Sequence, residues 1–366
     1  MLGCQVMTKP ASSRCNLDCQ YCFYIAKPPR PVMSEATLEC FIKQYISAQT
    51  GPDVHFAWQG GEPTLCGLDF FRLVVELQRR YGDGKRITNA FQTNGILLTD
   101  NWCRFFQQHH WLVGISLDGP EDLHNALRVN RQGRGTYHKV MAAIKRLRCH
   151  RVSFNILTVV NRCNCRHPER VYRFLRSLGT PFLQFIPLVD KENPQAISGP
   201  EWGHFLKRVF DIWVQEDIGQ VFVQLFDSTL GVWRGYPSQL CALSQTCGHA
   251  FALEANGDVY QCDHFVEPAH LLGNIHRKPL SALNSHKDAV AFGRQKLTTL
   301  AEECHRCSVR AFCHGDCPRH REEGKSVLCS GYQDFFRYSA PYMQAMRNLI
   351  QQQRSPSELM RHLKRQ

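Results

Sequence analysis

The fold is decided near the amino terminus, where residues 5–24 read QVMTKPASSRCNLDCQYCFY. The run Gln5–Thr8 is typical of a short β-strand. The loop after it carries Cys15, Cys19 and Cys22 with the spacing Cys-x3-Cys-x2-Cys. Three soft thiolates close together are one short of the four that saturate a four-iron cluster. The stretch therefore predicts a strand followed by a [4Fe-4S] cluster with one open iron.

An open iron can chelate the amino and carboxylate groups of S-adenosylmethionine. A reduced cluster can then pass one electron to the sulfonium and cleave it to a 5′-deoxyadenosyl radical. The aromatic pair Phe23-Tyr24, directly after the last cysteine, fits the same pattern. A zinc site or a chance spacing is the alternative reading of the three cysteines.

Short β-branched or aromatic runs alternate with helical patterns from the amino terminus to about residue 190. One helical pattern places Leu38, Phe41, Ile42, Tyr45 and Ile46 on one stripe, with Ser34 as N-cap. Six β/α units predict an α/β fold, an open, partial (β/α)6 barrel. After Gln5–Thr8, the strands are expected at Val54–Trp58, Ile87–Gln92, Leu112–Leu117, Val152–Val160 and Phe182–Leu188.

In parallel barrels the active site lies at the carboxyl ends of the strands, so catalytic and cofactor-binding residues are expected there. Gly60, Gly61, Glu62 and Pro63 follow the second strand, and the Glu62 carboxylate is placed to meet the methionine ammonium of the cofactor. An ordinary strand-to-helix turn is the alternative. Two further candidates for cofactor contacts are Ser116 and Arg128, the latter because a guanidinium can clamp a carboxylate.

Cysteines recur beyond residue 235 and mark a second domain. Three of them lie in residues 241–262 and five in residues 304–329. Their number predicts two fully liganded four-iron clusters, in which one cysteine of the later region completes the ligand set of the earlier region. Two Cys4 zinc sites are the alternative. Asn256-Gly257, between alternating residues, predicts a hairpin that delivers Cys262 and Asp263 to a defined place. The expected domains are 1–235, 236–333 and a helical segment 334–366. The eight late cysteines are Cys241, Cys247, Cys262, Cys304, Cys307, Cys313, Cys317 and Cys329.

Composition limits the possible protein classes. The 366 residues, 43% hydrophobic and 21% charged, are sufficient for a large core and exclude a disordered chain. The net charge of +12 points by itself toward nucleic acid, but three clusters would offset roughly −5 of it. Without an apolar membrane span or an export signal, we expect a cytoplasmic protein with reduced thiols, no membrane partner and no nucleic-acid partner.

With these residues described, the sequence resembles the radical S-adenosylmethionine (SAM) superfamily. Within it, the match is to the anaerobic sulfatase-maturating enzymes with a C-terminal cysteine-rich SPASM domain. The resemblance extends over nearly the whole chain and is weak between about Asp190 and Tyr236. Its motifs are Lys9–Ser13, Trp58–Leu65, Gln92–Gly95, Leu117–Pro120 and the two cysteine regions.

The resemblance implies an oxidoreductase that converts a Ser or Cys of a sulfatase Cys/Ser-x-Pro-x-Arg segment to formylglycine. It implies three [4Fe-4S] clusters, S-adenosylmethionine, an electron donor such as flavodoxin or ferredoxin, and a monomer. The first cluster would be held by Cys15, Cys19 and Cys22. The first auxiliary cluster would be held by Cys241, Cys247, Cys262 and Cys317, and the second by Cys304, Cys307, Cys313 and Cys329.

The same resemblance assigns roles to single residues. Asp263 matches the family's proposed general base, Tyr24 and Gln59 match positions near the substrate, and Ser116 and Arg128 match cofactor-binding positions. The general base would take the proton after the deoxyadenosyl radical has removed a hydrogen from the Cβ of the target.

Two other functions are compatible with parts of the sequence. A radical SPASM enzyme that crosslinks or epimerises a ribosomal peptide would share both cysteine regions, but barely fourteen residues precede Cys15, too few for a peptide-recognition domain there. A basic zinc protein that binds nucleic acid would be colourless, and it would have no use for the glycine-rich strand ends.

Overall fold

The structure is a computed structural model that describes residues 3–248 and 250–363. The chain folds into two compact units, each built from separated segments. The first contains residues up to Ser116, Leu127–Phe154 and Cys247–Gln295; the second contains Leu117–Ala126, Asn155–Thr246 and the residues from Lys296 onward. The predicted domain boundaries at 235 and 333 follow a different division and stay predictions.

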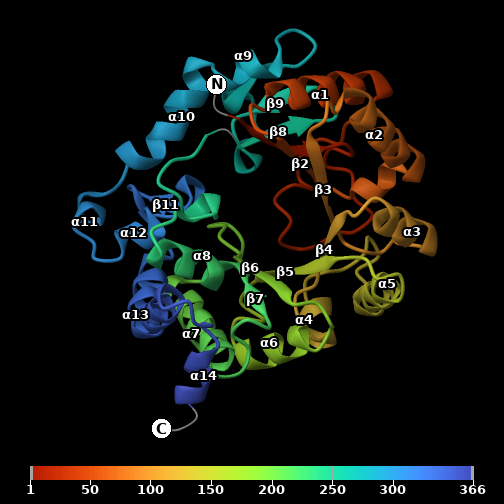
Figure 1. Ribbon diagram of the computed structural model, residues 1–366. Helices are drawn as coiled ribbons and strands as arrows, with labels where there is room; N and C mark the ends of the chain where they lie inside the picture. Colours follow the sequence, from red (N-terminus) through yellow and green to blue (C-terminus); the bar gives the residue numbers. More distant parts are fainter. Residues whose placement is uncertain (1–2, 249, 364–366) are drawn as a thin grey trace. The chain divides into compact units, whose positions relative to one another are not determined.

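The first unit contains strands of a mostly parallel sheet, with an antiparallel part at β8, β9 and β10, and helices that cover it (Figure 1). The strands are paired in the order β10-β9-β8-β1-β2-β3-β4. Its strands are β1 (Gln5–Lys9), β2 (Asp53–Trp58), β3 (Arg86–Thr93), β4 (Leu112–Ser116), β8 (Ala250–Glu254), β9 (Asp258–Tyr260) and β10 (Leu271–Asn274). Its helices are α1 (Glu35–Ala48), α2 (Leu68–Tyr81), α3 (Asp100–Gln108), α5 (Tyr137–Cys149), α9 (Leu280–Asn284) and most of α10 (Lys287–Thr298), with short 3-10 helices η1 (Pro63–Cys66), η3 (Asp263–Phe265) and η4 (Pro268–His270).

The predicted strands and the first helix of this unit are confirmed, with ends that differ by one or two residues. Parallel register holds from β1 to β4. Helix α1 begins where the Ser34 side chain accepts a hydrogen bond from the Thr37 amide. Its predicted apolar stripe is buried, and Phe41 packs edge-on against Phe56 and Trp58 of β2. The spacing of apolar residues therefore directs α1 onto the sheet.

The predicted hairpin is also confirmed, but its position was not predicted. Strands β8 and β9 are antiparallel and joined through Gly257, whose φ of +88° suits glycine. Strand β8 pairs in parallel with β1 from Gln5↔Ala250 to Lys9↔Glu254. The hairpin thus lies beside the N-terminal strand, although more than half of the chain separates them in sequence (Figure 1). This pairing places the residues after β9 near the loop after β1.

The second unit contains three strands, paired in parallel in the order β5-β6-β7, and a layer of long helices. Its strands are β5 (Phe154–Val160), β6 (Phe182–Pro187) and β7 (Phe222–Val223), with a separate ribbon of β11 (Arg321–Glu322) and β12 (Lys325–Ser326). Its helices are α4 (Glu121–Asn125), α6 (Pro168–Arg176), α7 (Gly199–Glu216), α8 (Gln224–Trp233), α11 (Glu302–His305), α12 (Arg310–Cys313), α13 (Cys329–Gln351) and α14 (Glu358–Leu363), with 3-10 helices η2 (Cys241–Leu243) and η5 (Pro318–His320).

Helices α7 and α13 pack closely at three glycines (Figure 1). A Cβ on Gly331 would lie 2.1 Å from the Gly199 carbonyl oxygen, and one on Gly203 would lie 2.8 Å from the Gly331 Cα. Only residues without a side chain permit this approach. The segment 334–366, predicted to be helical, contains most of α13 and all of α14, with residues 352–357 outside both helices, and α13 begins earlier, at Cys329. None of the described helices is long and apolar enough to cross a membrane.

Candidate active site and cluster sites

The loop that carries Cys15 is joined to the residues after β2 by the backbone amides of Gly61 and Glu62. The Gly61 amide donates to the Ser12 carbonyl (2.7 Å), and the Glu62 amide donates to the Arg14 carbonyl (2.8 Å). Gly60 has a φ of +135°, and a Cβ on Gly61 would lie 2.0 Å from the Arg14 carbonyl oxygen. The glycine pair is therefore required for the loop to approach β2. This is a structural reason for a motif that the sequence linked to the cofactor.

The Cys15 thiol is surrounded by donors. The Leu17 amide donates to Cys15 Sγ at 3.4 Å, and Asn94 Nδ2, from the end of β3, lies 3.7 Å from the same sulfur. Burial raises the pKa of the Cys15 thiol to about 12, so cluster binding has to displace a proton from this site. A turn closes the loop further on, where the Cys22 amide donates to the Cys19 carbonyl (3.0 Å). These contacts fit a loop shaped for thiolate ligands.

Glu62 is fully buried and bound to the chain itself. Its carboxylate accepts hydrogen bonds from the amide and hydroxyl of Thr64 (3.1 and 2.7 Å), from the Thr93 hydroxyl (2.7 Å) and from the Asn94 amide (2.8 Å). Burial raises the pKa of Glu62, and these donors act against that rise. The carboxylate joins the ends of β2 and β3. Its predicted contact with the cofactor stays a prediction.

The two other candidate cofactor contacts lie in the same unit as the loop of Cys15, Cys19 and Cys22, which we call the cluster loop. Ser116 ends β4, and its hydroxyl accepts a hydrogen bond from Gln92 Nε2 (3.0 Å). Arg128 is buried, with 7% of its surface exposed, and its guanidinium lies 5.3 Å from the centre of the Tyr21 ring and 4.0 Å from Cys19 Sγ. A buried guanidinium at the cluster loop is suited to bind a carboxylate.

Asp263 lies at the start of η3, and each of its two carboxylate oxygens contacts a polar side chain. One oxygen forms an ion pair with the ammonium of Lys9, and the other accepts a hydrogen bond from Gln59 Nε2 (3.4 Å). Burial acts to raise the pKa of Asp263, but the charges of Lys9, His264 and Lys27 outweigh it and hold the pKa below its usual range. The structure therefore brings Asp263 and Gln59 together, and the roles that the resemblance gives them stay predictions.

Tyr24 completes this group. Its ring lies 4.0 Å below the Lys9 ammonium, and its hydroxyl donates to the Glu254 carboxylate. Lys9 and Glu254 are register partners in β1 and β8, so both side chains point to the same face of the sheet. Burial raises the pKa of Glu254, and the Lys9 charge counteracts part of that rise.

Sequence reasoning missed Lys9 and Glu254. Lys9 is only 2% exposed. A lysine and a glutamate at strand ends look like ordinary surface residues in the sequence, and only the pairing of β1 with β8 shows that both are buried.

Four of the five cysteines in the last region line one pocket of the second unit. These are Cys304, Cys307, Cys313 and Cys329. Gln333 of α13 donates to the sulfurs of Cys307 and Cys329, both at 3.6 Å. Cys317 is not among the described residues that line this pocket. The grouping coincides with the predicted second auxiliary cluster, and a pocket lined by four thiols fits such a cluster.

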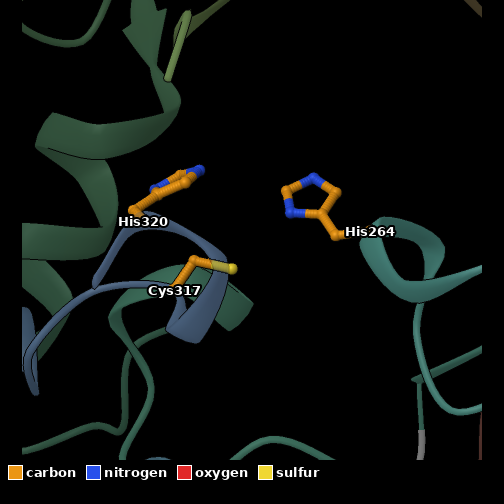
Figure 2. Close-up of side chains that lie close together, drawn as sticks. All are labelled: His264, Cys317 and His320. Atoms are coloured by element: carbon orange, nitrogen blue, oxygen red, sulfur yellow. The ribbon is translucent and has the colours of Figure 1, made fainter. Parts of the chain in front are cut away.

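The four predicted ligands of the first auxiliary cluster belong to different units. Cys247 and Cys262 belong to the first unit, and Cys241 and Cys317 belong to the second. Cys247 donates its amide to the Gly293 carbonyl (3.0 Å). Cys317 and His320 lie on the same short turn around η5, as Figure 2 shows. Next to Cys317 in the chain, Asp316 is fully buried and pairs with His320 (2.9 Å). This ligand set stays a prediction.

Two family models match the chain. One, the radical SAM superfamily, matches residues 10–175; the other, SPASM, an iron-sulfur cluster-binding domain, matches residues 241–308. Fold and site thus define a radical SAM protein with a SPASM domain, which confirms the predicted fold class. A serine-type anaerobic sulfatase-maturating enzyme of Bacteroides thetaiotaomicron is 40% identical over 98% of this chain and 95% of its own length. The chain belongs to the family of anaerobic sulfatase-maturating enzymes.

Relatives of both types are similar to this chain. A cysteine-type anaerobic sulfatase-maturating enzyme of Clostridium perfringens is 33% identical over 94% of this chain and 98% of its own length. Among solved structures, native anSMEcpe with bound AdoMet and the Cp18Cys peptide superposes with a TM-score of 0.89 at 34% identity, covering 94% of this chain and 99% of that one. The similarity therefore extends through both cysteine regions.

Proposed function

We propose that this protein oxidises the Cβ of a serine or cysteine in a sulfatase Cys/Ser-x-Pro-x-Arg segment to formylglycine without oxygen. The observation that carries the proposal is the grouping of Asp263, Gln59 and Tyr24 in the first unit, beside the cluster loop. The membership of the chain in a family with serine-type and cysteine-type members supports it.

The cofactors of this reaction would be held by residues already described. Cys15, Cys19 and Cys22 would hold the first cluster, and Arg128, Ser116 and the Gly60-Gly61-Glu62 turn would surround S-adenosylmethionine. The auxiliary ligands would be the two sets of four cysteines given above. When bound, these groups supply the deoxyadenosyl radical that removes a hydrogen from the target Cβ and an acceptor for the remaining electron.

Asp263 would act as the general base. After the hydrogen atom has left Cβ, the target must lose one electron and the proton of its hydroxyl or thiol, and an ionised carboxylate can accept that proton. The Lys9 ammonium keeps Asp263 ionised, and Gln59 directs the second oxygen of its carboxylate. Tyr24, anchored by Glu254, would form the wall against which the target side chain lies. A serine then gives the aldehyde directly, whereas a cysteine gives a thioaldehyde that water hydrolyses.

We also propose that the protein is a cytoplasmic monomer. The physiological electron source would be flavodoxin or ferredoxin, since the first cluster must be reduced by a donor of low potential.

The experiment uses protein reconstituted without oxygen, S-adenosylmethionine, a chemical reductant and paired sulfatase peptides that differ only in Ser or Cys at the target. Mass spectrometry follows the peptide and the nucleoside products. We expect formylglycine with one equivalent of 5′-deoxyadenosine. Deoxyadenosine without a peptide change would contradict the substrate assignment and favour modification of another peptide, such as a ribosomal peptide.

A further inference from the structure

A short loop, residues 129–135, lies against the cluster loop in the first unit; we call it the basic loop. Residues 17–20 pair antiparallel with residues 127–130 through a bridge between Leu17 and Asn130 and backbone hydrogen bonds of 2.9 and 3.0 Å. Backbone hydrogen bonds thus hold residues 17–20 of the cluster loop alongside the start of the basic loop.

The arginines of this segment face in two directions. Arg128 is buried and lies over the Tyr21 ring, toward the predicted cofactor site. Arg131 and Arg134 are exposed. The Arg131 side chain returns to the cluster loop, where its Nη2 donates to the Cys15 carbonyl oxygen (2.6 Å). An exposed cation therefore contacts the backbone of a predicted cluster ligand directly.

The basic loop is held in one conformation by Asn130. The Asn130 side chain accepts hydrogen bonds from the Gln132 amide (2.9 Å) and the Arg134 amide (3.0 Å), and its own amide donates to the Arg134 carbonyl (2.9 Å). Gly133 supplies the left-handed turn, with a φ of +72°. Because the loop is already ordered, little conformational entropy of the loop is lost when a partner binds these arginines.

The exposed charges here are mostly positive. Within residues 14–20 and 127–135, all of which the structure describes, the exposed charged side chains are those of Arg14, Asp18, Arg131 and Arg134. Three cations and one anion beside a redox site favour an acidic partner. Charge complementarity of this kind speeds encounter, and electron-transfer complexes are typically small and transient.

We propose that the basic loop, together with Arg14, is the docking surface for an acidic one-electron carrier protein that reduces the cluster of Cys15, Cys19 and Cys22. The inference rests on the proposed function, because only a reduced cluster can cleave the cofactor. Each docking event oxidises the carrier by one electron and reduces the cluster by one electron, and no bond is formed or broken in that step. Flavodoxin and ferredoxin share this chemistry, and the experiment uses each of them separately.

The test compares two routes of reduction in the reconstituted holoprotein. In one arm reduced flavodoxin or reduced ferredoxin is the donor, and in the other dithionite is the donor. The variant Arg14→Glu/Arg134→Glu leaves the Arg131 contact with Cys15 intact. The control, Arg72→Glu/Arg104→Glu, reverses two exposed arginines of α2 and α3 in the same unit. The readouts are the oxidation rate of the carrier, followed by absorbance, and the rate of deoxyadenosine formation.

We expect the loop variant to lower both rates with at least one carrier by about tenfold or more at low salt, while rates with dithionite stay within about twofold of wild type. Rising salt should slow the wild type more than the variant. Equal losses with dithionite, or no loss with either carrier, would overturn the proposal. If the wild type cleaves the cofactor but makes no formylglycine, the proposed function fails, and these same two rates still decide the docking surface.

Discussion

At the scale of single residues, the charges around Asp263 decide what the site can do. A base that is held ionised by a buried ammonium is ready to take a proton at neutral pH. Asp263→Asn keeps the shape and removes the base. We expect it to cleave S-adenosylmethionine at close to the wild-type rate and to form formylglycine about 10²- to 10⁴-fold more slowly, as for loss of a general base. Mass spectrometry of both products measures the ratio, and a wild-type yield of formylglycine would remove Asp263 from the mechanism.

Lys9 gives a second prediction at this scale. Removing one partner of a buried ion pair leaves an uncompensated charge, which costs more than removing both. We expect Lys9→Met to lower the midpoint of thermal unfolding markedly, and Lys9→Met/Asp263→Asn to recover part of that loss. Lys85→Met, in the same unit, is the control, because Lys85 donates to backbone carbonyls at Gln49 and Gly51. Strictly additive effects of the two substitutions would show that the pair is not coupled.

At the scale of elements, close backbone contacts carry two further predictions. Gly61→Ala would place a Cβ 2.0 Å from the Arg14 carbonyl oxygen, so the cluster loop would have to move. We expect the variant to lose iron bound at the first cluster and, with it, most deoxyadenosine formation. Gly51→Ala is the control, since a Cβ there meets nothing within 4 Å. Iron analysis and the electron paramagnetic resonance signal of the reduced cluster measure the outcome; normal cluster content in Gly61→Ala would contradict the structural reading of the motif.

The contact between α7 and α13 is tested in the same way. Gly331→Ala would force the two helices apart, because its Cβ would lie 2.1 Å from the Gly199 carbonyl oxygen. Overpacking of this kind costs about 1–3 kcal/mol. Gly231→Ala, inside α8 with open space around it, should instead be neutral or stabilising by up to about 1 kcal/mol. Thermal unfolding of the holoprotein distinguishes them, and similar midpoints for the two variants would argue against close helix packing.

For the whole molecule, the number of clusters is the quantity to measure. Cys241 and Cys149 are both exposed, but only Cys241 belongs to a predicted ligand set. We expect Cys241→Ser to lower bound iron by up to one four-iron cluster and to make the protein more sensitive to proteolysis, since metal binding contributes to folding. Cys149→Ser should match the wild type in both respects. Iron analysis after reconstitution checks this, and an unchanged iron content would remove Cys241 from the ligands.

Much of this architecture could be predicted from the sequence, and the reasons are local. Apolar spacing and the Ser34 cap specify α1, and Asn256-Gly257 specifies the hairpin of β8 and β9. The parallel pairing of β8 with β1 could not be predicted, because nothing in either strand identifies its partner. For the same reason Lys9 and Glu254 were missed as site residues. The small second strand ribbon, β11 and β12, was also not predicted, since strands of two residues carry no periodic signal.

The pairing of β1 with β8 has a consequence for the synthesis of the chain. Ribosomes add about 5–20 residues per second, so the roughly 245 residues between the two strands take about 12–50 seconds to appear. During that interval one edge of β1 has no neighbour, and exposed strand edges invite aggregation. Lys9 likewise lacks its neighbours Glu254 and Asp263 until those residues have been synthesised. The nascent chain therefore carries an unpaired strand edge next to the loop of Cys15, Cys19 and Cys22 until residues 250–254 have left the ribosome.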